Sequence, residues 1–130
     1  MLRDALLKFT RELSARLVIR SVSETMILVN DDAYSESIAL TPEEMLGSWT
    51  ATAIADLDES HFAKLLATGP EVVLLGTGLT NVFPPRELTF SFARQGIGFE
   101  AMDTAAAART FNVLANEDRR VAAVLYLAGK

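Results

Sequence analysis

The sequence VVLLGTG at residues 72–78 has four consecutive apolar residues followed by a glycine loop. A short, continuous apolar run of this kind is typical of a strand buried on both faces of a parallel sheet. Two prolines follow, and residues 86–95 then place Leu88 and Phe92 on one face of a helix that ends at Gly96. This stretch therefore predicts a buried strand, a tight loop and a helix.

The rest of the C-terminal half continues in the same order. Residues 97–102 predict a strand, an alanine-rich helix begins at Asp103 or Thr104 and runs to about Asn116, and residues 121–127 predict a final strand. Strands that alternate with helices are the signature of an α/β domain, in which the helices cover a largely buried sheet.

The N-terminal half is less regular. Residues 26–29 and 34–40 flank the turn residues 30–32 and predict a β-hairpin. Residues 41–44 have the form of a helix start, which Gly47 limits to a single turn.

A second helix start lies at residues 56–59, and the helix that follows ends at Gly69 and Pro70. This helix carries His61, the single histidine of the chain. A lone histidine without a second ligand nearby is expected to be a surface or capping residue.

Residues 1–16 have apolar residues at spacings of three and four and a charged opposite face, so they predict an amphipathic helix. Two roles are open for it: packing on the domain or on a second copy, or binding a partner or a membrane surface. Since no linker or repeat divides the remainder, we expect residues 17–130 to form a single α/β domain.

Composition excludes several classes of function. The absence of cysteine rules out disulfides, thiolate nucleophiles and cysteine zinc sites, and with one histidine we expect no metal site and no cofactor. A formal charge of −5 without a long basic run argues against nucleic acid as a partner. Without a long apolar segment or a signal-peptide pattern, the expected location is the cytoplasm.

The candidate site lies where the two predicted parallel strands end, because ligand crevices in open α/β sheets lie beyond the carboxyl ends of the strands. The glycine loop departs from a dinucleotide-binding motif, since Asn81 replaces the third glycine and no helix follows directly. The alternative is that the polar residues there only cap the following helix. The candidate residues for a ligand or partner cleft are Gly76, Thr77, Gly78, Asp103, Thr104, Arg109 and Asn112.

The runs at residues 72–78 and 96–114, with Pro84 and Pro85 between them, resemble an uncharacterised Mth-type domain family. That family includes mitochondrial complex I assembly factor 3 and the adipogenesis-associated Mth-type domain proteins. The resemblance implies a three-layer single domain with a central mixed sheet plus an N-terminal β-hairpin. It also implies assembly work for the eukaryotic members, although one fold hosts many functions.

Three functions remain open. The first is a non-enzymatic binding or assembly module that contacts a protein partner, with a homodimer or peripheral membrane association as variants. The second is a small-molecule or anion binder at the strand ends, and the third is an enzyme that uses Asp103 with His61; we assign no catalytic residue. An exposed apolar patch would favour the first, a closed polar pocket the second, and contact between His61 and Asp103 the third.

Overall fold

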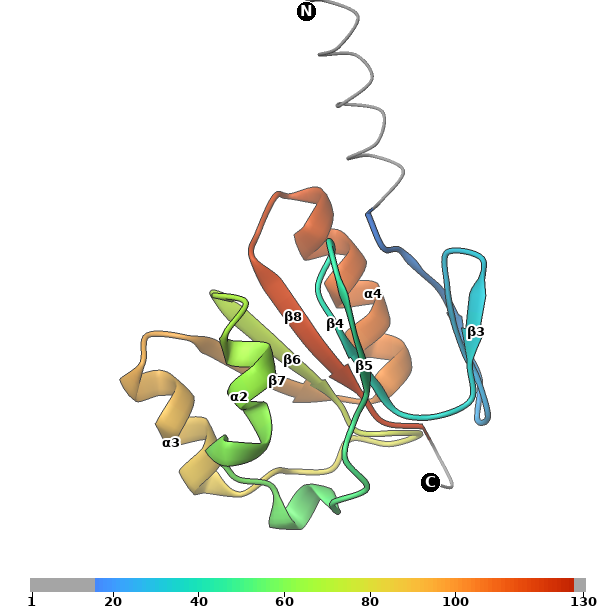
Figure 1. Ribbon diagram of the computed structural model, residues 1–130. Coiled ribbons are helices and arrows are strands. Elements are labelled where there is room, and N and C mark those ends of the chain that lie inside the picture. The colour runs from blue at the N-terminus through green and yellow to red at the C-terminus, as the bar shows by residue number, and fades with distance from the viewer. Residues whose placement is uncertain (1–15, 128–130) are drawn as a thin grey trace, which may run out of the picture.

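The computed structural model describes residues 16–127, which form two sheets and a set of helices (Figure 1). The N-terminal sheet is antiparallel and has the order β1-β2-β3. The larger sheet has the order β5-β4-β8-β6-β7 and is mixed, because β6 runs parallel to β7 and β8 while β4 runs antiparallel to β8 and β5. The strands are β1 (Ile19–Val22), β2 (Ile27–Val29), β3 (Asp32–Tyr34), β4 (Ile38–Leu40), β5 (Met45–Ser48), β6 (Val72–Gly76), β7 (Gly98–Met102) and β8 (Val121–Leu125).

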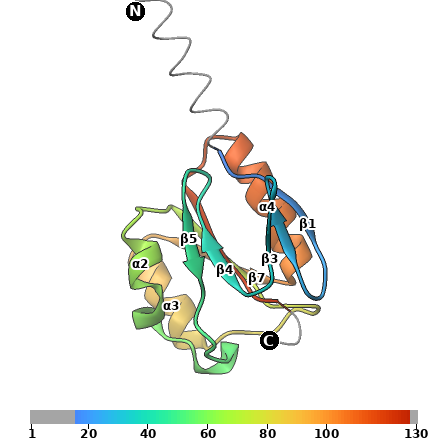
Figure 2. The same cartoon turned by 45° about the vertical axis from the view of Figure 1, so that its right-hand side comes forward.

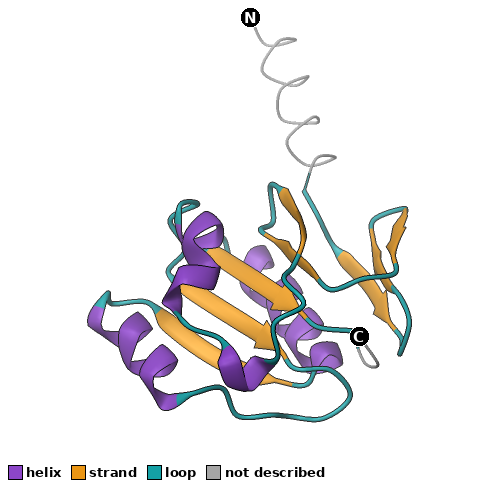
Figure 3. Cartoon of the chain, turned by 60° about the horizontal axis from the view of Figure 1, so that its bottom comes forward, coloured by secondary structure: helices purple, strands orange, loops and turns teal. Residues whose placement is uncertain are grey.

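Helices cover both faces of the larger sheet (Figure 3). Successive side chains of a strand point to opposite faces, so Leu74 of β6 packs toward α4 while Val73 and Leu75 pack toward α3. The helices are η1 (Ile54–Asp56), η2 (Glu59–Phe62), α2 (Ala63–Leu66), α3 (Arg86–Arg94) and α4 (Thr104–Asn116).

The two faces of the sheet bury separate apolar clusters. The α4 cluster contains Phe111 and also holds the buried residues of the N-terminal sheet, so α4 and that sheet share one layer. Figure 2 shows β1 and β3 beside α4. The α3 cluster contains Phe62 and Phe92 from the other helical layer. The predicted three-layer α/β domain with a central mixed sheet is therefore confirmed.

The C-terminal half follows its prediction closely. The strand at 72–76, the helix from residue 86 and the helix capped by Asp103 are all present, and Leu88 and Phe92 are fully buried. This agreement reflects strong apolar periodicity in each segment, which decides element type when the element is buried. The helix predicted for residues 1–16 lies outside the described residues, apart from Arg16.

The predicted hairpin is right in its first strand and its turn, where Asn30 has a φ of 50°, but its second strand is wrong. Residues 34–40 are not one strand: β3 ends at Tyr34, and β4 begins at Ile38 in the other sheet. Buried Ser37 fixes the crossing, because its hydroxyl accepts from the Leu127 N–H at 3.0 Å and its carbonyl accepts from the Trp49 N–H at 2.8 Å.

Residues 41–44 form a turn between β4 and β5 and not a helix start. The Thr41 hydroxyl accepts from the N–H groups of Glu43 and Glu44, as the side chain of a helix N-cap does, but the chain reverses direction here and no helix follows.

Strand β1 was not predicted. Within residues 16–127, no helix has the length and apolar character needed to cross a bilayer.

Candidate functional site

The loops that follow β6 and β7 lie side by side, as expected for adjacent parallel strands. The Thr77 N–H donates to the Met102 carbonyl at 2.8 Å, and the Thr104 N–H donates to the Gly78 carbonyl at 2.9 Å. The sequence prediction that these two loops are neighbours is confirmed.

Thr104 holds three chain segments together at this edge. Its hydroxyl donates to the Tyr126 carbonyl at 2.6 Å and accepts from the Gly78 N–H at 2.8 Å. Gly76 lies directly beneath, where an added Cβ would come within 3.0 Å of the Cα and Oγ1 of Thr104. Gly76 is therefore a packing residue, and the Thr104 hydroxyl has both its donor and acceptor roles filled by the protein.

Thr77 shapes the loop that follows it. Its buried hydroxyl donates to the Thr80 carbonyl at 2.6 Å and accepts from the Val82 N–H at 3.0 Å. A buried hydroxyl with several partners restrains the backbone around it, because breaking these bonds would leave buried polar groups unsatisfied. Thr77 thus supports the loop.

Asp103 is the N-cap of α4, since its Oδ1 accepts from the Ala106 N–H at 2.8 Å. An acidic cap also interacts favourably with the N-terminal end of the helix dipole. This is the capping role that the sequence left open as the alternative to a ligand site.

Three of the candidate residues nevertheless line a shared hollow of about 230 Å³ between the strand ends and the turn after β1. Its acidic groups are Asp103 and Glu24, and its apolar contacts come from Val22, Leu79 and Ala105. The hollow is open and its buried side-chain polar atoms are all bonded within the described part of the chain. The candidate residues that line it are Gly78, Asp103 and Thr104.

Two more candidate residues, Arg109 and Asn112, line a neighbouring hollow of about 300 Å³ between β1 and α4. Asn112 bridges the two elements: its Nδ2 donates to the Ile19 carbonyl at 2.8 Å, and its Oδ1 accepts from the Ile19 N–H at 3.0 Å. The amide thereby occupies hydrogen-bonding groups of β1 that a neighbouring strand would otherwise use. Asn112 is therefore a structural clamp, whereas Arg109 is exposed.

Strand β1 supplies the wall of this site that the sequence did not reveal. Arg20 lines the larger hollow, and Val22 lines both. The sequence does contain apolar residues at positions 17, 18, 19 and 22, which suit a partly buried strand. The segment is too short and its alternation too weak for these residues alone to predict one.

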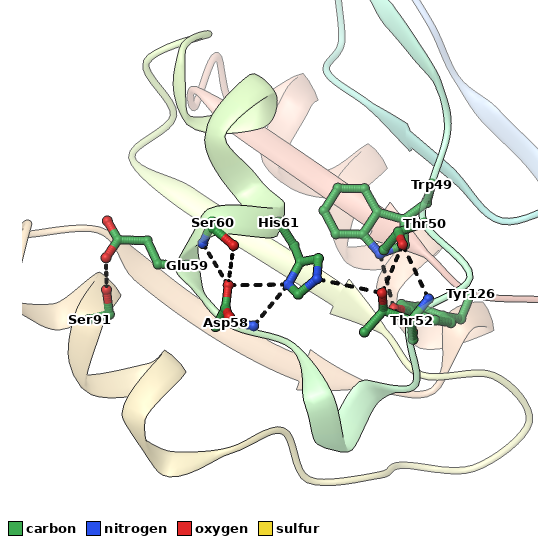
Figure 4. Close-up of polar contacts among 9 residues, drawn as sticks. All are labelled: Trp49, Thr50, Thr52, Asp58, Glu59, Ser60, His61, Ser91 and Tyr126. Atoms are coloured by element: carbon green, nitrogen blue, oxygen red, sulfur yellow. Dashed lines mark hydrogen bonds and ion pairs between the residues drawn. The ribbon is translucent and has the colours of Figure 1, made fainter.

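His61 lies in the other helical layer (Figure 4). Its Nδ1 accepts from the Asp58 N–H at 3.1 Å and completes a capping box at the start of η2, and its Nε2 is 3.5 Å from the Thr52 hydroxyl. The predicted capping role is confirmed. Since Asp103 begins the helix on the opposite face of the sheet, the hypothesis of an Asp103–His61 pair is wrong.

The polar groups around His61 continue to Tyr126 (Figure 4). The Tyr126 hydroxyl donates to the Thr52 carbonyl at 2.7 Å and accepts from the Trp49 Nε1 at 3.0 Å. Burial raises the pKa of the Tyr126 phenol, although the Trp49 hydrogen bond acts in the opposite direction.

The Ser60 hydroxyl and N–H lower the pKa of Asp58, which fits its role as a cap. Within residues 16–127, no group of three or more acidic or histidine side chains is placed to hold a metal ion.

The loop between β6 and α3 is unusual for its exposed apolar side chains. Phe83 is 84% exposed and Leu79 is 65% exposed, and Val82 is also exposed. We call Leu79, Val82 and Phe83 the 79–83 loop patch. It adjoins the smaller hollow, which Leu79 lines. Exposed apolar side chains gathered in one loop are a feature of many interaction sites.

Comparison with known proteins places this geometry in a family context. A family model described as "Protein of unknown function (DUF498/DUF598)" matches residues 19–126. The 13 kDa major membrane protein of Francisella tularensis subsp. holarctica is 36% identical over 72 residues, which cover 55% of this chain and 58% of that protein. The NADH dehydrogenase (ubiquinone) 1 alpha subcomplex assembly factor 3 of Danio rerio is 31% identical over 117 residues, 88% of this chain and 67% of that protein.

Solved structures agree with the architecture. An NMR structure from Xanthomonas campestris is 38% identical with a TM-score of 0.79, covering 87% of this chain and 86% of that one. A Bordetella pertussis protein described as a Mth938-like domain is 32% identical with a TM-score of 0.75, covering 90% of this chain and 89% of that one. The Mth-type fold expected from the sequence resemblance is confirmed.

Proposed function

The chain belongs to the DUF498/DUF598 family of proteins of unknown function, and we propose that it is a non-enzymatic binding module that assembles with another protein through direct contacts. The 79–83 loop patch is the observation that carries this proposal. An exposed apolar patch favours an assembly module, whereas a ligand binder would need a closed polar pocket at the strand ends.

The loop is built to present its apolar side chains. The Thr77 hydroxyl holds the backbone at Thr80 and Val82, and two prolines follow Phe83 directly. Proline fixes φ and so reduces the freedom of the segment. A restrained loop loses little conformational entropy when a partner binds, which favours affinity.

Phe83 is the side chain expected to contribute most. Large aromatic residues dominate the binding energy of protein interfaces when they enter a pocket of the partner. Leu79 and Val82 would surround it with apolar area that excludes water. The 79–83 loop patch therefore fits a partner with an apolar pocket.

The relatives support a protein as the partner. One relative is named as an assembly factor of NADH dehydrogenase and another as a membrane protein. These names support a partner that is a subunit of a larger complex. The cytoplasmic location and a homodimeric state stay predictions.

The test is affinity purification of the tagged protein from its own cells, read by mass spectrometry. We expect specific protein partners with the natural chain, and their loss with Phe83→Ser. Phe90→Ser is the matched control, because Phe90 is also an exposed phenylalanine, 52% exposed, but lies on α3 and outside the 79–83 loop patch.

Unchanged thermal stability of both variants must accompany this result, so that the loss reflects binding. Equal capture by the natural chain and Phe83→Ser would contradict the role of the 79–83 loop patch. A chain that begins at Arg16 tests in parallel whether the segment before it contributes to partner capture, which is one of the two roles that the sequence left open for it.

A further inference from the structure

Charged side chains line the surface along β1 and the N-terminal part of α4, which we call the seam between β1 and α4. The proposed role of the 79–83 loop patch does not account for them. Hollows that share lining residues follow one another along the seam: the basic hollow, about 300 Å³, shares Val22 and Ala105 with the acidic hollow, about 230 Å³. The basic hollow lies between β1 and α4, whereas the acidic hollow lies beyond the end of β1, between the turn that follows it, the start of α4 and the loop after β6.

Two guanidinium groups line the basic hollow, from Arg20 on β1 and Arg109 on α4. Both residues are exposed, and neither has an ion pair or a side-chain hydrogen bond among residues 16–127. Among the described residues, no carboxylate lines the same hollow. Arg16 and Arg119 form ion pairs, with Asp118 and Glu71, whereas Arg86 and Arg94 on α3 form none among residues 16–127. The shared hollow is therefore what sets Arg20 and Arg109 apart.

The presence of two arginines in one hollow is notable in a chain with 17 acidic and 12 basic residues. Two like charges in one hollow repel, and an anion placed between them would remove that repulsion. Guanidinium groups bind carboxylates through paired, charge-assisted hydrogen bonds. Ala105 and Ala108 also line this hollow, and their side chains take up little of it because they end at Cβ.

The clamp formed by Asn112 fixes the two arginines relative to one another. It joins α4 to Ile19, the residue before Arg20, through two hydrogen bonds. Arg109 lies one turn before Asn112 on the same helix. The positions from which both side chains extend are therefore set by the fold before any ligand arrives.

We infer that the seam between β1 and α4 is a second contact surface, which binds an extended acidic segment of a protein partner with its carboxylates between Arg20 and Arg109. An extended segment suits the basic hollow, because all four residues of β1 line it. The carboxylates of Glu24 and Asp103 at the far end favour a partner segment whose charge turns basic there. This inference rests on the proposed function, because it names the chemistry of a protein partner.

The test uses the full chain, labelled with ¹⁵N, and a capped peptide of alternating threonine and glutamate. Glutamates at alternate positions lie on one side of an extended peptide, as the two arginines require. We expect the backbone amide signals of Arg20, Ser21 and Arg109 to shift on titration, and the affinity to fall as salt is added. The same peptide with glutamine in place of glutamate should not bind.

The double variant Arg20→Gln with Arg109→Gln should weaken binding of the glutamate peptide at least tenfold. Its matched control is Arg86→Gln with Arg94→Gln, since both of these arginines are exposed on α3, without an ion pair among residues 16–127. The control should change affinity less than twofold. Equal weakening by the two pairs would overturn the inference, because it would mean attraction by overall charge.

Two further outcomes would also overturn it. One is the absence of any shift at millimolar peptide, and the other is an equal response to inorganic phosphate, which would identify a site for small anions. Either result can occur while Phe83→Ser still abolishes partner capture. In that case the proposed function stands and only the acidic-segment inference is wrong.

Discussion

Gly76 is the residue at which the end of the central sheet is most closely packed. A Cβ there would meet Thr104 at 3.0 Å and Leu125 at 3.1 Å, and these neighbours belong to α4 and β8. We expect Gly76→Ala to lower the free energy of unfolding by about 1–3 kcal/mol, which is typical of overpacking.

Gly98→Ala is the matched control for this experiment. Gly98 also lies in a strand of the sheet, but an added Cβ would have its nearest contacts at 3.6 Å. The effect there should stay below about 1 kcal/mol, because alanine fits and restricts the unfolded chain. Urea unfolding of both variants measures the difference, and similar losses at the two positions would show that the packing of Gly76 is not special.

Tyr126 gives a prediction that depends on pH. In Tyr126→Phe the Trp49 Nε1 loses its acceptor and the Thr52 carbonyl loses a donor. We expect the free energy of unfolding at pH 7 to fall by about 1–3 kcal/mol, the usual cost of partly buried groups left without partners.

The pKa of Tyr126 is raised by burial above its ordinary value of 10.0, so the fold favours the protonated phenol. The resulting stabilisation is present below pH 10 and is lost as the pH rises through the folded-state pKa. Phenylalanine cannot ionise, so the difference in stability between the natural chain and Tyr126→Phe should narrow above pH 10. Thermal unfolding between pH 7 and pH 11 measures it, and a gap that widens would contradict the assignment.

At the scale of residues, the sequence anticipated capping better than it anticipated the cleft. Asp103 and His61 act as caps, because capping depends on neighbours within three positions. Gly76 and Thr77 were assigned to the cleft and have packing and loop-supporting roles, and their neighbours come from α4, from other strands or from the following loop. Local spacing carries no information about such contacts.

Among the elements, Glu71, the residue just before β6, forms hydrogen bonds with the residues just before β8. Its Oε1 accepts from the Arg120 N–H at 3.0 Å and from the Arg119 Nε at 2.9 Å. These contacts, first the Arg120 N–H and then Arg119, lower the pKa of Glu71 below its ordinary value of 4.5. Stability that depends on the carboxylate is therefore present above pH 4.5 and lost as the pH falls through the folded-state pKa.

We expect Glu71→Gln to lower the melting temperature at pH 7 and to make it less sensitive to acid below pH 4.5. Scanning calorimetry between pH 7 and pH 3 tests this. Glu43→Gln is the control, because Glu43 is exposed and has no ion pair among residues 16–127. A Glu71→Gln chain that loses stability in acid as steeply as the natural chain would show that other carboxylates dominate.

The elements also differ in how far the sequence determined them. Strand β6 and helix α4 were predicted because each has one clear pattern, a continuous apolar run closed by glycine in β6 and a capped run of 13 residues in α4. Strand β1 and the break between β3 and β4 were missed because strands of three or four residues carry too little pattern, and the break depends on contacts of Ser37 with Trp49 and Leu127. The missing β1 is also why Arg20 escaped notice.

On the scale of the whole molecule, one sheet serves two apolar clusters. Neighbouring residues of β8 alternate between them: Ala123 belongs to the α4 cluster, while Ala122 and Val124 belong to the α3 cluster. Damage to one cluster should therefore reach the other through the shared strands. We expect the molecule to unfold in one cooperative step, as small single domains usually do.

Phe111 and Trp49 allow that expectation to be tested across the sheet. Phe111 is fully buried in the α4 cluster, whereas Trp49, the only tryptophan of the chain, packs on Phe62 in the α3 cluster with ring centroids 5.0 Å apart. Phe111→Leu removes volume from the layer that Trp49 does not occupy. The loss in free energy of unfolding should be about 1–2 kcal/mol, below the ~3–5 kcal/mol typical of phenylalanine to alanine.

Trp49 fluorescence and far-ultraviolet circular dichroism should then shift to the same lower urea midpoint in Phe111→Leu. Phe92→Leu, which removes the same volume from the α3 cluster, is the matched control and should also move both signals together. If Trp49 fluorescence kept its natural midpoint in Phe111→Leu while circular dichroism shifted, the two layers would unfold separately. The shared strands would then fail to couple the seam beside α4 to the layer that contains α3.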